Sequence, residues 1–402
     1  MNLQKVTLAS VSKLGHGEYG IGAPAVKYSK NLYTYLRITD IKDDGTLNMT
    51  ELKSVDDEKA SQYLLKPNDI VFARTGASTG RNYFYDGTDG KFVYAGFLIK
   101  FSIASDKVNP KFIKYYCMSD LYKGWIRSFN TGSTRGNINA QTLGEMTIYL
   151  PSRKQQDGMV RILSCIDSKI KNNLEINKNL LEQAQALYKS WFIDFEPFNG
   201  TKPDDWNLGI IEDLAKEIIC GKTPSTKVAD YYGSDIPFIT IPDMHGNVYT
   251  VSTERYLSFL GAQSQANKML PINAICVSCI GTAGLVTLVA TESQTNQQIN
   301  SIIPKNGYSP FYIYLLMQTL SEVINKLGQS GSTIVNLNKA QFSKIKVLVP
   351  SVASMKEFDV MVSPLFSLIH ENQEENIRLS SLRDTLLPRL MSGEIDVSNI
   401  DL

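Results

Sequence analysis

One stretch of sequence occurs twice in this chain of 402 residues. "GSTRGNINAQTLGEMTIYLPS" (132–152) aligns without a gap on "GSTIVNLNKAQFSKIKVLVPS" (331–351), which lies 199 positions later. Gly, Ser, Thr, both Asn, Pro and the last Ser are identical, and most other apolar positions stay apolar. Solenoid repeats are several times shorter than this period, so the pattern indicates two copies of a domain-sized unit. The sequence therefore predicts a tandem duplication.

Both copies predict the same order of elements. In the first copy, alternating apolar residues predict strands at 32–41, 69–74 and 91–103, and a helical pattern covers 110–129. The second copy predicts strands at 236–244 and 273–280 and a helix at 309–327. Such interleaving predicts an α+β fold with two mixed α/β domains.

A long helix is predicted to close each copy. Ser152 with Gln155, and Ser354 with Glu357, match the capping box that begins a helix. Apolar residues then follow at spacings of 3 and 4, with two asparagines at corresponding places. The two stripes are Leu163, Ile166, Ile170, Asn173, Asn177 and Leu180, and Val362, Leu365, Ile369, Asn372, Asn376 and Leu379.

Two such stripes would expose apolar surface unless the helices packed together, so we expect a two-stranded coiled coil. A duplication related by a two-fold axis makes the pair antiparallel and brings Asn173 and Asn177 near Asn376 and Asn372. The alternative is that these asparagines lie at a solvated edge. Each helix would be on the order of 50 Å long and act as a spacer. The expected domains are 1–150, 151–195 (first spacer helix), 196–349 and 350–402 (second spacer helix and tail).

Composition limits the class of protein. With 43% apolar residues both copies can bury a core, whereas the longest apolar run (311–317) is too short to cross a bilayer. The chain begins without a signal-peptide pattern, so we expect it in the cytoplasm. Cys276 and Cys279 have no second group of thiols or imidazoles nearby, which predicts reduced thiols and no metal site. Residues 1–150 carry 19 Lys and Arg against 14 Asp and Glu, so a phosphate-binding surface should favour the first copy.

Two glycine-containing motifs do not predict a nucleotide site. "GHGEYG" (15–20) matches the dinucleotide pattern, but Gly22 and Pro24 prevent the helix that must follow. "GKTPS" (221–225) resembles the end of a phosphate-binding loop, but it lacks the first glycine and Pro224 stops the helix. Neither motif fits a nucleotide site, and no other motif in the sequence indicates catalysis. We therefore predict no catalytic site.

Polar loops recur at equivalent places in the two copies, at 74–81 and 131–137 and at 221–227, 281–284, 295–298 and 329–333. Glycines let the backbone approach phosphates, hydroxyls bind phosphate oxygens, and Arg, Asn and Gln read base edges. The alternative is that these are ordinary turns. The candidate DNA-contacting residues are Arg74, Ser78, Thr79, Arg81, Ser133, Thr134, Arg135, Lys222, Thr223, Lys227, Asn296, Gln297, Ser332 and Thr333.

Three longer segments carry a family resemblance. They are "LPSRKQQDGMVRILSCIDSKIKNNLEINKNLLEQAQALYKSWFIDF" (150–195), "LRDTLLPRLMSGEIDV" (382–397) and "DWNLGIIEDLAKEIICGKTPSTKVADYYGSDIPFITIPDM" (205–244). The first two resemble the conserved helical regions of the specificity subunit of Type I restriction-modification enzymes. The third resembles the opening of that family's target-recognition domains.

The resemblance implies a non-catalytic subunit in which each recognition domain reads one half of a bipartite, asymmetric site in double-stranded DNA. It implies that the helices dock two modification (methyltransferase) subunits, which carry S-adenosylmethionine. Restriction (translocase and endonuclease) subunits, which use ATP and Mg²⁺, would join them. The chain itself would bind no cofactor and no metal, and it would not contact a membrane.

Two alternatives belong to other classes. A stand-alone bipartite DNA-binding regulator would bind its site tightly as the purified chain. A metal-dependent nuclease would use Asp44, Glu51 and Lys53, which loosely match a nuclease set, and would lose cleavage on Glu51→Ala.

Overall fold

The computed structural model describes residues 3–129, 137–328 and 336–397. The chain divides into two compact units: unit 1 comprises residues 1–168 and 380–402, and unit 2 comprises residues 169–379. Both units mix sheets and helices, which confirms the α+β prediction. The division falls inside the two long helices, after Ser168 in the first and after Leu379 in the second. Each long helix is therefore part of both units.

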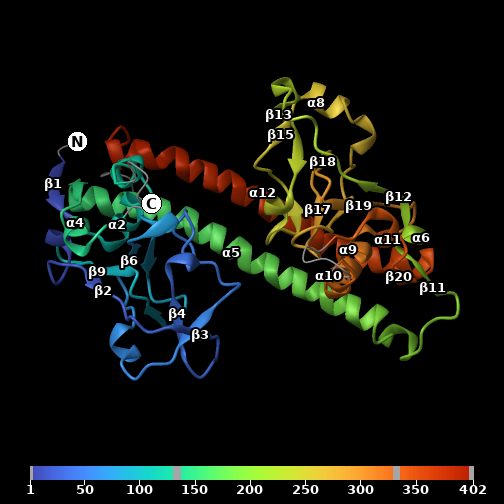
Figure 1. The fold of residues 1–402 in the computed structure, drawn as a ribbon, viewed down its shortest axis with the longest axis horizontal. Helices are drawn as coiled ribbons and strands as arrows, with labels where there is room; N and C mark the ends of the chain where they lie inside the picture. Colours follow the sequence, from blue (N-terminus) through green and yellow to red (C-terminus); the bar gives the residue numbers. More distant parts are fainter. Residues whose placement is uncertain (1–2, 130–136, 329–335, 398–402) are drawn as a thin grey trace. The chain divides into compact units, whose positions relative to one another are not determined.

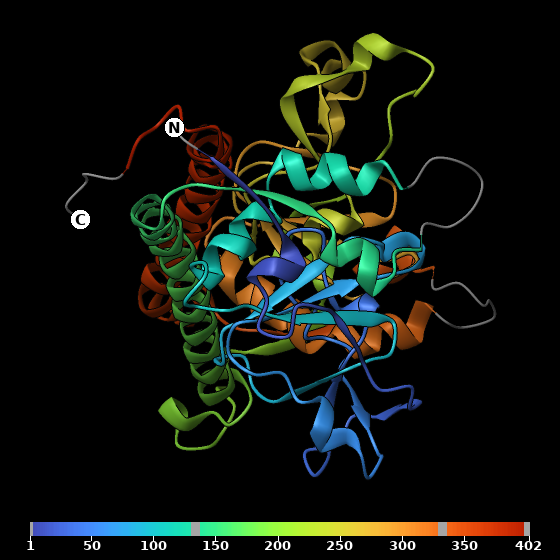
Figure 2. The ribbon, with the colours of Figure 1, turned by 90° about the vertical axis from the view of Figure 1, so that its left-hand side faces the viewer.

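The central sheet of unit 1 has four strands, each antiparallel to its neighbour. Their order is β2 (Glu18–Tyr19), β9 (Leu98–Ser102), β6 (Asp69–Ala73) and β7 (Asn82–Tyr85). All of β6 is buried, which explains the apolar run at 70–73 that follows Asp69. A second four-stranded sheet forms the lobe that Figure 2 shows in blue, projecting from the central sheet. Its order is β3 (Ala25–Lys27), β5 (Lys53–Val55), β4 (Tyr33–Leu36) and β8 (Phe92–Tyr94).

Unit 2 repeats this plan (Figure 1). Its central sheet has the order β12 (Ala215–Cys220), β19 (Ile299–Pro304), β16 (Ile275–Ser278), β17 (Val286–Val289) and β14 (Tyr249–Thr250). The first four strands are antiparallel, as in β2-β9-β6-β7, and β14 adds a parallel edge. A small sheet again forms a lobe, here with α8 (Phe259–Gln263). Its order is β15 (Tyr256–Leu257), β13 (Tyr232–Ile239) and β18 (Gln294–Thr295).

Matching strand pairs lead into the long helices. β1 (Gln4–Thr7) pairs with β10 (Thr147–Leu150), and β11 (Asn207–Ile210) pairs with β20 (Lys346–Val349), both antiparallel. The repeated Pro-Ser follows β10 and β20 and opens α5 (Arg153–Phe192) and α12 (Val352–Ser392). The short helices are α1 (Leu8–Val11), α4 (Ala140–Gly144), α6 (Ile211–Leu214), α7 (Ile241–Met244), α11 (Lys339–Ser343), η1 (Ile38–Asp40), η2 (Ala60–Tyr63), η3 (Gly76–Ser78), η4 (Glu196–Phe198), η5 (Ala229–Tyr231) and η6 (Ala266–Lys268).

Several predicted elements are divided in the structure. The expected helix at 110–129 is α2 (Pro110–Tyr116) and α3 (Asp120–Arg127), because Ser119 caps a new helix by accepting from the backbone N–H of Tyr122. The expected helix at 309–327 is likewise α9 (Pro310–Thr319) and α10 (Ser321–Gly328). The expected strand at 91–103 is β8 and β9, which are separated by a turn.

One of the two predicted helix caps is wrong. Ser152 precedes α5 and its hydroxyl accepts from the N–H of Gln155, at 3.4 Å. However, α12 begins at Val352, before the expected box at Ser354 and Glu357. Ser351 accepts from the N–H of Ser354, and the hydroxyl of Ser354 accepts from the indole of Trp206, at 3.3 Å.

Within unit 2, α5 and α12 run antiparallel. Asn372 donates its amide to Asn177 Oδ1 at 2.8 Å, and Asn173 donates to Asn376 Oδ1 at 2.9 Å. The residue numbers rise along α5 where they fall along α12, which fixes the antiparallel direction. The asparagines thus lie between the helices and not at a solvated edge. The helices have 40 and 41 residues, so each is about 60 Å long.

The residues of the two predicted stripes face the interior to different degrees. Those that are buried are Leu163, Ile166, Asn173, Asn177, Val362, Ile369 and Asn372. Those that are half-buried are Ile170, Leu180, Leu365, Asn376 and Leu379. Some buried stripe residues belong to the apolar core of their unit: Leu163 packs in the core with Phe112 and Ile148, and Val362 and Ile369 in the core with Tyr312. Among the described residues no helix is long and apolar enough to cross a membrane.

Candidate nucleic-acid interface

Three loops meet beside the central sheet of unit 1, and we call them loop cluster 1: residues 19–22, 74–81 and 94–97. Backbone hydrogen bonds join them, from Gly20 N to Leu98 O, from Ile21 N to Tyr94 O and from Arg74 N to Phe97 O. The loops therefore form one connected surface built on the ends of β2, β6 and β9.

Unit 2 contains the same arrangement, loop cluster 2: residues 220–223, 279–285 and 294–298. Gly221 N donates to Ile299 O, Lys222 N to Thr295 O and Cys279 N to Gln298 O. Each bond has its counterpart in loop cluster 1. The backbones of the two clusters are therefore equivalent, although the side chains they carry differ.

Each of the two motifs that were not predicted to bind a nucleotide contains a glycine that approaches a neighbouring loop closely. A Cβ on Gly20 would lie 2.2 Å from the carbonyl oxygen of Ala95, and a Cβ on Gly221 would lie 2.0 Å from that of Asn296. Only glycine allows the chain to pass this close to the neighbouring loop. Gly20 and Gly221 therefore occupy the same place in the two clusters.

Arg74 is the candidate residue that loop cluster 1 presents most clearly. Its guanidinium carbon lies 5.1 Å from the ring centroid of Tyr19, in cation–π geometry. The hydroxyl of Tyr19 accepts from Ala140 N at 3.1 Å, which fixes the ring. Arg74 Nε is buried without a hydrogen-bond partner in the described part of the chain.

The other candidates of loop cluster 1 are held within the fold. Ser78 and Thr79 are each only 8% exposed. The guanidinium of Arg81 binds both carboxylate oxygens of Asp43, at 2.6 and 3.1 Å, and donates to the carbonyl of Ile41. These three side chains therefore support the loops.

In loop cluster 2 the structure brings Lys222, Thr223 and Gln297 together. The Thr223 hydroxyl donates to Gln297 Oε1 at 2.6 Å, while Lys222 and Gln297 are exposed. Asn296 is 9% exposed, and its amide is bonded to the main chain and side chain of Gln298. Asn296 therefore also belongs to the support of the cluster.

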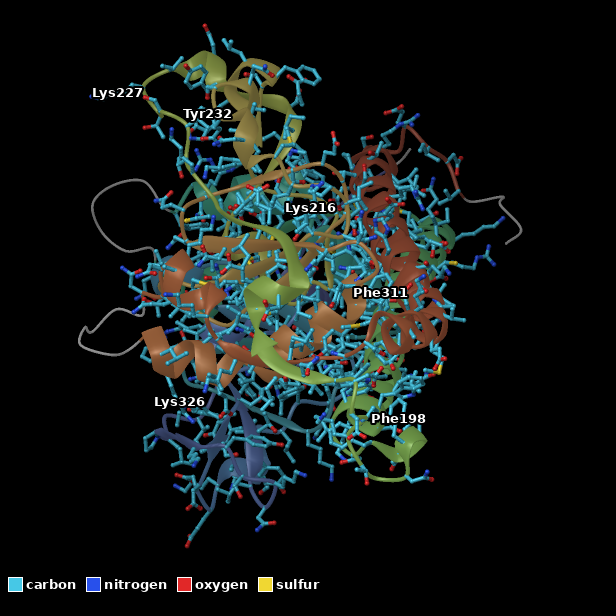
Figure 3. All side chains as sticks on the ribbon, turned by 90° about the vertical axis from the view of Figure 1, so that its right-hand side faces the viewer. Phe198, Lys216, Lys227, Tyr232, Phe311 and Lys326 are labelled. Atoms are coloured by element: carbon cyan, nitrogen blue, oxygen red, sulfur yellow. The ribbon has the colours of Figure 1, made fainter. Side chains whose placement is uncertain are left out.

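Lys227 lies on the segment that leads to the small sheet of unit 2. Figure 3 shows it at the outer rim of the lobe, near Tyr232, and Lys216 lies lower down on β12. Lys227 is exposed. It adds positive charge to the lobe without being part of loop cluster 2.

The remaining candidates, Ser133, Thr134, Arg135, Ser332 and Thr333, lie outside the described residues. The residues that follow them do contact the clusters. Asn137 forms a β-bridge with Thr75, and Asn336 forms one with Ile280. Each repeated "GST" stretch is therefore followed, a few residues later, by a residue bonded to its own loop cluster.

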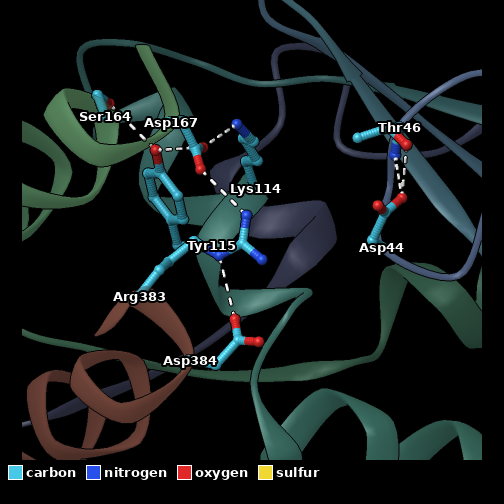
Figure 4. A network of polar contacts seen from close by, with 8 residues as sticks. All are labelled: Asp44, Thr46, Lys114, Tyr115, Ser164, Asp167, Arg383 and Asp384. Carbon is cyan, nitrogen blue, oxygen red and sulfur yellow. Dashed lines mark hydrogen bonds and ion pairs between the residues drawn. The ribbon is translucent and has the colours of Figure 1, made fainter. Parts of the chain in front are cut away.

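The cysteines and the acidic candidates show no catalytic arrangement. Cys276 and Cys279 are free and buried, and burial raises the pKa of Cys279 to about 11. Asp44 accepts from the N–H and hydroxyl of Thr46 within its own turn, as Figure 4 shows. Within the described residues no three His, Cys, Asp or Glu side chains are grouped to hold a metal ion.

A charged network joins α2 of unit 1 to the two long helices (Figure 4). Asp167 of α5 accepts from Lys114 Nζ at 2.6 Å, from the Tyr115 hydroxyl at 2.9 Å and from Arg383 of α12 at 3.3 Å. Burial raises the pKa of Asp167, but Lys114, Tyr115 and Arg383 outweigh it and hold this pKa below its ordinary value. Asp167 therefore stays a carboxylate at neutral pH.

Sequence reasoning missed Tyr19, Gly20, Gly221 and the Asp167 network. The signal for the glycines was present, because "YG" at 19–20 and "CG" at 220–221 end corresponding strands. The spacing between them is 201 residues, so the ungapped shift of 199 did not align them.

The fold and the two loop clusters define a tandemly duplicated α+β protein. Its two polar surfaces have equivalent backbones and different side chains. The family model described as "Type I restriction modification DNA specificity domain" matches residues 2–183 and 203–378. The chain belongs to this family, which confirms the resemblance seen in the sequence.

Relatives agree with this assignment. The chain is 31% identical over 404 residues to the Type I restriction enzyme HindI specificity subunit of Haemophilus influenzae, covering 82% of this chain and 87% of the relative. It is 24% identical over 316 residues to the MjaIX specificity subunit of Methanocaldococcus jannaschii, covering 74% and 72%. The S subunit of the Type I restriction-modification system from M. genitalium has a similar fold, with a TM-score of 0.58, 17% identity and coverage of 97% and 96%.

Proposed function

We propose that this chain is the non-catalytic specificity subunit of a Type I restriction-modification complex and reads a bipartite, asymmetric DNA site. One observation supports a bipartite DNA site: the two loop clusters share a backbone framework but have different side chains. Loop cluster 1 presents Arg74, whereas the equivalent position in loop cluster 2 is the buried Cys279. Loop cluster 2 instead presents Lys222 and Gln297. Different base-reading groups on one framework suit two different half-sites.

We assign DNA recognition to residues 1–150 and 196–349 and partner docking to the helical segments 151–195 and 350–402. Exposed apolar residues on the helices within unit 2 support docking: Val360 is 75% and Leu174 57% exposed. Large apolar side chains in water suit a protein partner. The proposed partners are two modification subunits, which carry S-adenosylmethionine, and restriction subunits that use ATP and Mg²⁺. The assembly would work in the cytoplasm, and this chain would hold no cofactor.

The test compares the purified chain with the complex formed by co-expressing it with its modification subunit. We expect the chain alone to bind DNA weakly, and the complex to contain two modification subunits and to methylate one bipartite site. Tight, specific binding by the chain alone would favour the stand-alone regulator.

The nuclease alternative has a separate test. We expect the purified chain with Mg²⁺ to leave supercoiled plasmid intact, and Glu51→Ala to change nothing. Cleavage that disappears in Glu51→Ala would overturn the non-catalytic assignment.

A further inference from the structure

We infer that Arg74, held against Tyr19, reads the major-groove edge of a guanine in the half-site recognised by unit 1. This inference rests on the proposed function and names the residue that determines one base. It starts from the backbone of Arg74, which is fixed on both sides. Its N–H donates to Phe97 O at 3.1 Å, and its carbonyl accepts from Ile138 N at 2.9 Å. A reading group placed this rigidly loses little entropy on binding.

Arg74 has no carboxylate partner among the described residues, in contrast to three other arginines of unit 1. Arg37 binds Asp40, Arg81 binds Asp43 and Arg153 binds Asp157. For Arg74, the described residues contain no ion pair, and its Nε is buried without a partner. An arginine that the fold leaves uncompensated is available to a ligand with acceptors.

The contact with Tyr19 determines which ligand fits. The Tyr19 ring lies on one side of the guanidinium, with its centroid 5.1 Å from the guanidinium carbon. Because Nε is buried, the two terminal nitrogens are the donors left for a ligand. A planar fork of donors matches two acceptors in one plane. Guanine presents such a pair, N7 and O6, in the major groove, and two hydrogen bonds from arginine are the commonest specific contact there. Loop cluster 2 has no equivalent arginine, because the buried Cys279 stands at that position.

The first experiment maps methylated sites in cells that express the modification subunit with wild-type chain, Arg74→Ala or Arg74→Lys. The wild-type site should contain a G·C pair in one half-site that relaxes in both variants, while the other half-site stays unchanged. Lysine keeps the charge but lacks the fork, so recovery of full specificity by Arg74→Lys would indicate a phosphate contact and refute the inference. Arg81→Ala is the matched control, because Asp43 already binds that guanidinium. If Arg81→Ala relaxes the same base pair, the effect belongs to the loop fold and the inference is wrong.

The second experiment measures binding of the assembled complex to duplexes of the mapped site in which that guanine is replaced by 7-deazaguanine. Removing N7 should weaken wild-type binding, within the roughly 5- to 150-fold range of a whole two-bond contact. The Arg74→Ala complex should bind both duplexes equally. Equal sensitivity of wild type and variant would refute the inference. A wild-type complex that methylates no bipartite site would instead refute the proposed function itself.

Discussion

At the residue scale, corresponding positions on the two long helices pack against their units through different interactions, polar in unit 1 and aromatic in unit 2. Asp167 in unit 1 corresponds, 199 residues later, to Phe366 in unit 2. Asp167 binds Lys114, Tyr115 and Arg383, whereas Phe366 stacks on Phe311 with ring centroids 4.4 Å apart. The Asp167 network stabilises unit 1 only when all its groups are paired, because a buried polar or charged group without its partner lowers the stability of the fold.

Asp167→Asn should therefore destabilise unit 1. The substitution keeps the size of the side chain but leaves Lys114 and Arg383 without their shared counter-charge. We expect the free energy of unfolding to fall by about 2 kcal/mol, the scale of hydrogen bonds to a charged group, measured by urea denaturation. Ser164→Ala, which removes only a hydroxyl 3.2 Å from that of Tyr115, should cost clearly less. Equal losses in the two variants would contradict this account.

The same carboxylate predicts a pH dependence. Its partners lower the pKa of Asp167 below the ordinary value of 3.8, so its contribution to stability is present above that value. The contribution is lost as the pH falls through the lowered pKa of the folded state. Urea denaturation should show a constant stability difference between wild type and Asp167→Asn from about pH 5 to 7, and a shrinking one below about pH 4. A difference that grows on acidification would contradict the sign of the shift.

At the element scale, the close approach at Gly221 supports loop cluster 2. Gly221→Ala places a Cβ against backbone carbonyl oxygens, which cannot move away as a flexible side chain would. We expect a loss of about 1–3 kcal/mol in stability, with weaker DNA binding through the displaced Gln297 loop. Gly22→Ala is the matched control, because a Cβ there meets nothing within 4 Å. If both variants behave alike in urea denaturation and DNA binding, the close approach is not what supports the loops.

The sequence predicted the regular elements better than the loops. The spacing of the apolar stripes predicted that α5 and α12 pack together, because a helix face repeats with a fixed period. The two-fold relation expected between the copies predicted the antiparallel direction seen in unit 2. The loops carry no such period: the gap between the glycines of the 74–81 loop differs from that of 281–284, so the copies drift out of register. The Arg81–Asp43 pair spans 38 residues between loops, and no local pattern marks such a tertiary contact.

At the scale of the whole molecule, the two units share one architecture, whereas the side chains of their loop clusters differ. Each unit has its own apolar core, and each loop cluster is built on its own central sheet. Side chains on one cluster can therefore change without disturbing the other. Such independence has an energetic consequence, because effects of substitutions without shared partners add.

Arg74→Ala and Gln297→Ala should therefore act on different half-sites and add. Gln297 is exposed, with Oε1 bonded to Thr223, and a glutamine amide matches the N6 and N7 atoms of adenine. Each single variant of the assembled complex should lose about 1–3 kcal/mol in binding to the mapped site. The double variant should lose the sum within about 0.5 kcal/mol. Lys222→Ala provides the contrast: if its ammonium binds a phosphate, the substitution should weaken binding to all sequences alike and reduce the slope of affinity against salt by about one. Strong coupling between Arg74 and Gln297, or relaxation of the same half-site by both, would show that the two clusters do not read the DNA separately.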